Sequence, residues 1–106
     1  MHVLFDQGTP APLRHELPLH PVETAHERGW ATTCNGDRLQ AAENAGFDVL
    51  ITTDQNLQCQ QNLAERRIAI TVLNTTSWPR IRTASAAIDA AVTQCATKRF
   101  IEIRIP

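Results

Sequence analysis

The chain has 106 residues and a mass of 11.8 kDa, which is the size of one domain. Its content of 42% hydrophobic and 20% charged residues is that of a globular protein and excludes a disordered chain. The net charge of −1 excludes a general basic field, so any contact with nucleic acid has to come from a local patch of the surface.

The first half of the chain predicts two short strands and two helices. The apolar run at residues 3–5 predicts a strand, and leucines four positions apart predict a short helix at 11–17. Prolines then interrupt the chain, and residues 22–25 predict a weak second strand. A helix is predicted over 35–46, where Asp37 and the glutamine three positions later resemble a capping box and a glycine ends the helix.

The second half alternates strongly between apolar and polar segments. Residues 49–52 predict a buried strand, 55–66 a polar helix and 68–73 a second buried strand. One long helix is predicted to begin at Pro79. Its apolar stripe consists of Ile81, Ala84, Ile88, Val92 and Cys95. Residues 100–105 predict an edge strand, because isoleucines at 101, 103 and 105 alternate with Glu102 and Arg104.

This alternation of strands and helices predicts the fold class. We expect one domain over residues 1–106, an α/β fold built as a three-layer α/β/α sandwich around a mainly parallel sheet of about five strands. Ligands of such folds bind beyond the carboxyl ends of the strands, near the point where the strand order reverses. Asp6 and Asp54 follow predicted strands at that edge, and Asp37 at a helix amino end is expected beside them.

Three carboxylates at one crevice indicate a divalent metal, because they repel each other unless a cation lies between them. Mg²⁺ and Mn²⁺ prefer oxygen ligands, lower the pKa of a bound water and neutralise charge on a phosphodiester. Each acid also has a structural alternative, which the sequence leaves open. Asp37 and Asp54 are suited to cap the helices that follow them, and Asp6 is suited to close a turn.

Three segments resemble the small PIN-like domains, and more narrowly the short predicted toxin components of the DUF5615 type. They are Val3-Leu4-Phe5-Asp6-Gln7, Asn35-Gly36-Asp37 and the segment VLITTDQNL at 49–57. The resemblance implies a ribonuclease that depends on Mg²⁺ or Mn²⁺, with acids gathered at the carboxyl edge of a parallel sheet. It also implies a bacterial toxin that is inhibited by a cognate antitoxin protein.

Matched by position, the resemblance assigns both the metal ligands and the catalytic residues. Asp6 corresponds to the ligand after the first strand, Asp37 to the acid that opens a helix, and Asp54 to the acid of a T-x-D motif. Thr52 corresponds to the hydroxyl residue of that motif, which supports the site by hydrogen bonding. RNA is the implied substrate, and the sequence leaves open whether the chain forms a homodimer.

The chain departs from the PIN-like pattern at two positions where many relatives carry acids. Gln7 follows the first aspartate, and Asn56 lies two residues after Asp54. Amides can support a hard metal or orient water, but they add no negative charge, so we expect weaker metal binding. This departure keeps open a second function, a PIN-like interaction module that has lost catalysis. A receiver domain is disfavoured, because Gln7 replaces one of its paired acids and Lys98 precedes the last strand.

Arginines near the acids offer contacts to RNA phosphates. Arg14, Arg28 and Arg38 lie close in sequence to the candidate site and predict a rim of guanidinium groups. The alternative is that they are ordinary solvated side chains.

Cysteine usage and the short apolar runs predict a cytoplasmic protein. Cys34, Cys59 and Cys95 lack the spacing of a zinc site, and their odd number argues against a disulfide framework. No signal-peptide core is recognisable at the amino end, and the longest apolar run is too short to span a membrane.

Overall fold

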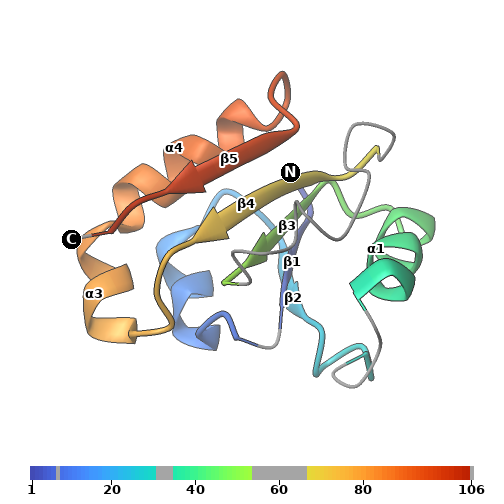
Figure 1. Ribbon diagram of the computed structural model, residues 1–106, viewed down its shortest axis with the longest axis horizontal. Coiled ribbons are helices and arrows are strands. Elements are labelled where there is room, and N and C mark those ends of the chain that lie inside the picture. Colours follow the sequence, from blue (N-terminus) through green and yellow to red (C-terminus); the bar gives the residue numbers. More distant parts are fainter. Residues whose placement is uncertain (7, 31–34, 54–66, 106) are drawn as a thin grey trace.

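The computed structural model describes residues 1–6, 8–30, 35–53 and 67–105, and the backbone alone for residues 35–38. Five strands form one parallel sheet in the order β2-β1-β3-β4-β5 (Figure 1). The strands are β1 (Val3–Phe5), β2 (Val22–Thr24), β3 (Val49–Thr52), β4 (Ala69–Leu73) and β5 (Phe100–Ile103). The structure therefore confirms the predicted α/β fold with about five strands.

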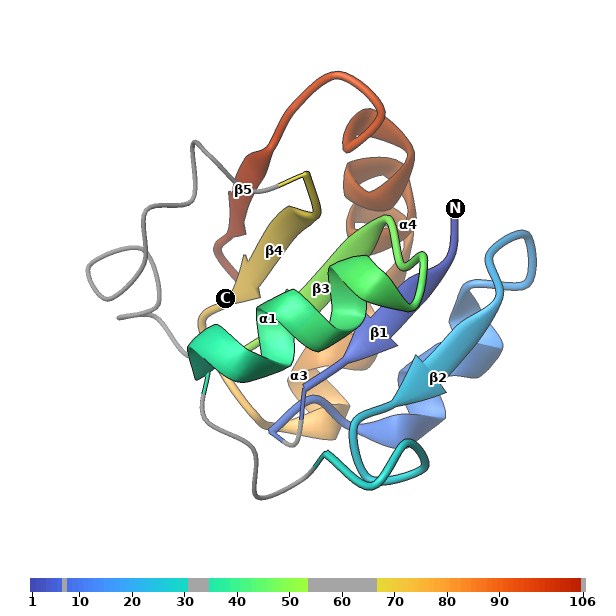
Figure 2. The ribbon, with the colours of Figure 1, turned by 90° about the vertical axis from the view of Figure 1, so that its right-hand side faces the viewer.

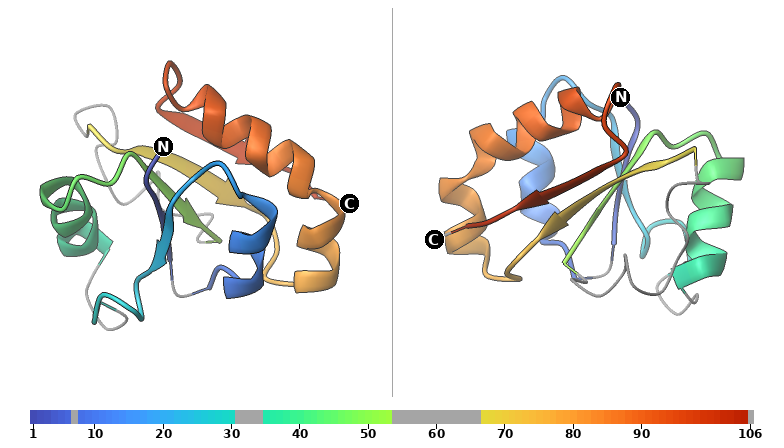
Figure 3. Two further views of the ribbon diagram at one scale, coloured as in Figure 1. Left: turned by 180° about the vertical axis from the view of Figure 1, so that it is seen from behind. Right: turned by 45° about the horizontal axis from the view of Figure 1, so that its top comes forward.

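The described helices lie on both faces of the sheet (Figures 2 and 3). They are the 3-10 helix η1 (Ala11–Glu16) and the α-helices α1 (Asn35–Asn44), α3 (Trp78–Thr83) and α4 (Ser85–Gln94). Helix α1 packs on one face, and η1, α3 and α4 pack on the other. Because both faces are covered, β1, β3 and β4 are buried along their whole length, which explains their continuous apolar sequences.

The amino end of α1 corrects one prediction, and its carboxyl end confirms another. The helix begins at Asn35, so Asp37 is its third residue and not the cap that the capping-box prediction required. At the other end, Gly46 has φ +88°. The Gly46 N–H donates to the Glu43 carbonyl and the Phe47 N–H to the Ala42 carbonyl. This is the Schellman arrangement, in which a left-handed glycine ends a helix.

The long helix predicted from Pro79 to Cys95 is interrupted and forms two helices. Ala84, with φ −106° and ψ 12°, separates α3 from α4. The Ala84 N–H donates to the carbonyl of Ile81, three residues back, and the Thr83 hydroxyl donates to the Arg80 carbonyl. Such side-chain bonds compete with the helical ladder. The predicted apolar stripe is nevertheless buried at Ile81, Ile88, Val92 and Cys95.

The carboxyl-terminal strand lies at the edge of the sheet, as predicted. The edge position of β5 is confirmed, with Ile101, Ile103 and Ile105 packed toward the core and Glu102 and Arg104 exposed. The helix predicted at residues 55–66 lies outside the described residues. Within the described ranges, no helix has the length and apolar character needed to cross a membrane.

Candidate active site

The candidate site lies where the strand order reverses. From β1 the chain continues to β2 on one side, and β3 then pairs with the other side of β1. Crevices beyond the carboxyl ends of parallel strands form at such points. Asp6 directly follows β1, and Thr52 is the last residue of β3. The Asp6 N–H donates to the Ile51 carbonyl at 3.0 Å, which holds the two strand ends together.

The side chains of Asp6 and Thr52 meet at this edge. The Thr52 hydroxyl donates to Asp6 Oδ2 at 2.6 Å. Thr52 is 0% exposed, so water cannot compete for its hydroxyl, whereas Asp6 is half-buried. A buried donor of this kind fixes the orientation of the carboxylate beside it.

The loop after Asp6 is held tightly against the end of β3. The buried Thr9 hydroxyl donates to the Ile51 carbonyl at 2.9 Å, and the Thr9 N–H donates to the Asp6 carbonyl at 3.0 Å. A Cβ atom at Gly8 would lie 2.3 Å from Thr53 Oγ1, so a larger residue would displace the Thr53 side chain. Gly8 and Thr9 were not among the predicted site residues, although a glycine followed by a threonine two residues after the site aspartate was a usable signal.

The other sequence-predicted site residues are described only in part or not at all. Gln7, Asp54 and Asn56 lie outside the described residues, as do the side chains of Asp37 and Arg38. The backbone of Asp37 lies in the first turn of α1, and α1 runs antiparallel to the strands, so this turn lies toward their carboxyl ends (Figure 2). Among the residues whose side chains are described, no group of three potential metal-ligating side chains occurs. The convergence of the three aspartates therefore stays a prediction.

The two described arginines of the predicted RNA rim make intramolecular contacts. Arg14 donates to the Val22 carbonyl at 3.0 Å and forms an ion pair with Glu27. The Arg28 guanidinium lies over the Trp30 ring, 4.9 Å from its centroid, and 5.4 Å from that of Phe47. Arg28 Nη1 also lies 3.7 Å from Glu23 Oε1. Each of the two arginines is therefore paired with a glutamate, and Arg28 is held in addition by stacking on aromatic rings.

A reciprocal pair of hydrogen bonds joins Thr24 and Glu27 after β2. The Thr24 N–H donates to Glu27 Oε1 at 2.9 Å, and the Glu27 N–H donates to the Thr24 hydroxyl at 3.1 Å. This is a capping box with the spacing T-x-x-E, a signal that the sequence carries at Thr24 and Glu27. Hydrogen bonding from Arg14, followed by that from the Thr24 N–H, lowers the pKa of Glu27 to about 2.

This lowered pKa predicts how Glu27→Gln changes stability with pH. The folded pKa of about 2 lies below the ordinary 4.5, so ionised Glu27 stabilises the fold above pH 4.5 and loses that effect as pH falls through 2. We expect Glu27→Gln to melt below the wild type at neutral pH and to match it in strong acid. Thermal unfolding across this range tests it, with the exposed Glu16→Gln as control. A difference that is independent of pH would contradict the prediction.

Asp6 also lines a cleft of about 650 Å³, a volume typical of ligand-binding sites. Its walls come from segments far apart in the sequence. They include Thr9, Arg14 of η1, His26 and Glu27 after β2, and Trp78 of α3. The carboxylate held by Thr52 therefore opens into a space that can accommodate part of a substrate.

Comparison of the chain with protein-family models, curated proteins and solved structures finds no match. The resemblance to PIN-like domains therefore stays a prediction.

Proposed function

We propose that the protein is an endoribonuclease that depends on Mg²⁺ or Mn²⁺, with its metal site at the carboxyl edge between β1 and β3. The observation that carries this proposal is the Asp6 carboxylate, which is oriented by the buried Thr52 hydroxyl and lines a cleft. A carboxylate supported by a hydrogen bond from a neighbouring side chain is the kind of ligand that a hard divalent cation prefers.

In this proposal Asp6, Asp37 and Asp54 hold the metal, and Thr52 positions Asp6. The bound metal would activate a water molecule and neutralise charge on the phosphodiester. Gln7 and Asn56 would add uncharged oxygen atoms near it. With only three carboxylates, we expect metal affinity in the millimolar range.

The substrate proposed for the cleft beside Asp6 is RNA. Arg14 lines this cleft, but its ion pair with Glu27 leaves less positive charge for phosphates. Arg28 Nη1 lies 3.7 Å from Glu23 Oε1, so its charge is shared with a carboxylate in the same way. Arg28 and Arg38 stay proposed contacts to the RNA backbone. The roles of toxin and of a cognate antitoxin rest on the PIN-like resemblance, and they are part of the proposal on that basis.

The second candidate function is a PIN-like interaction module without catalysis. Gln7 and Asn56 favour it, because they replace acids that would strengthen metal binding. The two functions differ in their response to metal, which gives a direct test.

Metal-dependent stabilisation and RNA cleavage should occur together in the wild-type protein. A ligand that binds only the folded state raises its melting temperature, so Mn²⁺ at millimolar concentrations should shift the thermal transition upward. The same Mn²⁺ should support cleavage of a mixed pool of RNA, and EDTA should stop it. Ca²⁺ is the control for a general effect of divalent ions. No shift and no cleavage at tens of millimolar Mn²⁺ would favour the interaction module.

A further inference from the structure

Strand β5 leaves one edge of the sheet open among the described residues. The strand pairs with β4 alone, and the Ile70 N–H donates to the Arg99 carbonyl at 2.8 Å. Backbone groups of successive strand residues point to alternate sides. The N–H and C=O groups of residues 99, 101 and 103 therefore face β4, and those of Phe100 and Glu102 face away from the sheet.

The extended backbone continues beyond β5 to Ile105. There the Asn74 side chain forms the hydrogen bonds that a neighbouring strand would otherwise provide. Asn74 follows β4, and its Oδ1 accepts the Ile105 N–H at 2.9 Å while its Nδ2 donates to the Ile105 carbonyl at 3.2 Å. Arg80 also donates to that carbonyl at 2.8 Å. The backbone N–H and C=O of Ile105 thus face the sheet. Those of Arg104 therefore face away from it, like those of Glu102.

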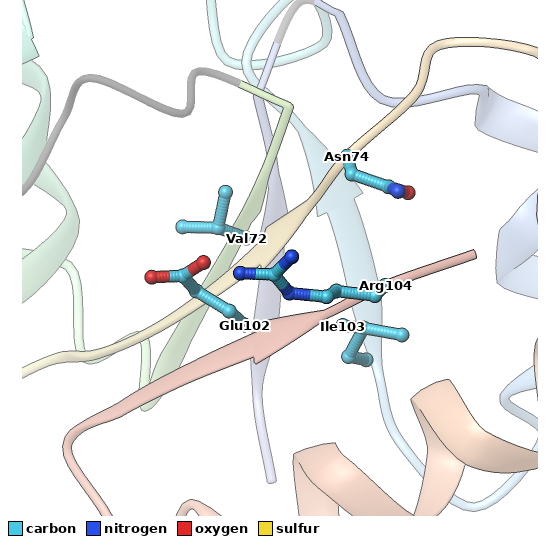
Figure 4. Close-up of a pocket in the computed structure, with 5 residues that line it drawn as sticks. All are labelled: Val72, Asn74, Glu102, Ile103 and Arg104. Carbon is cyan, nitrogen blue, oxygen red and sulfur yellow. The ribbon is translucent and has the colours of Figure 1, made fainter. Parts of the chain in front are cut away.

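The outward edge carries two opposite charges on one face of the sheet. Figure 4 shows Glu102 and Arg104 around a pocket of about 140 Å³ that Val72, Asn74 and Ile103 complete. Both charged residues are exposed, and within the described part of the chain no hydrogen bond or ion pair involves either side chain. On the other face, Ile101 and Ile103 remain half-buried at the rim of the core.

We propose that β5 is the contact between two copies of this chain, paired antiparallel about a twofold axis at Ile103. This register places Glu102 of each copy opposite Arg104 of the other. The outward-facing N–H and C=O groups of Glu102 in one copy bond to those of Arg104 in the other, as in the hydrogen-bonded pairs of an antiparallel ladder. Ile101 lies opposite Ile105 of the second copy, so the apolar face continues across the contact. The pairing joins two sheets into one and is independent of the proposed enzymatic activity.

Charge selects this register over its neighbours. An axis at Glu102 would place two glutamates opposite each other, and an axis at Arg104 would do the same with two arginines; like charges opposite each other are unfavourable. Charges on an edge strand also serve to prevent association, which is the competing explanation. The order Glu-x-Arg on one face is self-complementary, however, and this favours pairing. Because the strand is short, we expect a weak dimer that forms at high protein concentration.

Charge reversal tests the contact directly. Sedimentation velocity at rising concentration should show the wild type moving from monomer toward dimer. E102R and R104E should each remain monomeric, because each places like charges opposite one another. A mixture of these two variants should form a heterodimer, since one carries two arginines at these positions and the other two glutamates. The double variant E102R/R104E should dimerise like the wild type.

The control is K98E, which changes the net charge as much as R104E but lies outside the paired register, so it should dimerise normally. Circular dichroism and thermal unfolding establish that each variant is folded. A wild type that remains monomeric at millimolar concentration would overturn the proposal, as would single reversals that dimerise normally. Failure of the mixed variants to associate would overturn the register.

Discussion

Asp6→Asn is expected to reduce metal-dependent RNA cleavage by more than about 100-fold while leaving the fold intact. The amide has the shape of the carboxylate and keeps an oxygen to accept the Thr52 hydroxyl, but it carries no charge for the metal. The backbone bonds from the Asp6 N–H to Ile51 and from the Thr9 N–H to the Asp6 carbonyl are unaffected. The variant should therefore remain folded, and Mn²⁺ should no longer raise its melting temperature.

The matched control for this variant is Asp48→Asn, at the opposite end of β3. Asp48 Oδ2 accepts the His2 N–H at 2.8 Å, and asparagine can retain that bond while removing the same charge. Cleavage of a mixed RNA pool and melting with and without Mn²⁺ are measured for both variants. Asp48→Asn should behave like the wild type. Full cleavage by Asp6→Asn, or equal losses in both variants, would contradict the assignment of Asp6 as a metal ligand.

The same variant also tests whether the three aspartates converge. If Asp37 and Asp54 lie close to Asp6, removing one charge relieves repulsion in the absence of metal. The metal-free Asp6→Asn protein should then melt above the wild type, at the expense of activity, as is common for active sites. An unchanged melting temperature in EDTA would indicate that Asp6 stands apart from the other two carboxylates.

The fold could be predicted where local sequence determines the structure. The buried strands β3 and β4 follow from continuous apolar segments, and the edge strand β5 from the alternation of isoleucine with Glu102 and Arg104. The break at Ala84 could not be predicted in this way. It lies in the backbone of Ala84, whose N–H bonds to the Ile81 carbonyl three residues back, and both a continuous and an interrupted helix fit the apolar stripe.

The site was predictable at its centre and not in its surroundings. Asp6 and Thr52 could be placed because each stands at the end of a recognisable strand, and parallel strands bring their carboxyl ends together. The cleft depends on contacts between distant segments, such as the pairing of Arg14 with Glu27, which no periodicity indicates. That pairing also explains why Arg14 is less suited to bind phosphate than its position in the sequence suggested.

Thr52→Val is expected to lower metal-dependent cleavage by about 10- to 100-fold, the usual effect of losing a group that orients a metal ligand. Valine fills the same buried space but cannot donate to Asp6 Oδ2, so the carboxylate loses the 2.6 Å bond that fixes its orientation. The half-buried Asp6 can turn toward water instead, so we expect the free energy of unfolding to change by no more than about 1 kcal/mol.

Two further threonine variants separate loss of the hydrogen bond from a general effect on the sheet. Thr52→Ser keeps the hydroxyl and should retain most of the activity. Thr71→Val makes the same change on β4, where Thr71 is also 0% exposed and its hydroxyl lies 3.4 Å from Cys95 Sγ, a weak interaction. Thr71→Val should cleave RNA like the wild type. Equal activities in the two valine variants would show that Thr52 fills space without positioning Asp6.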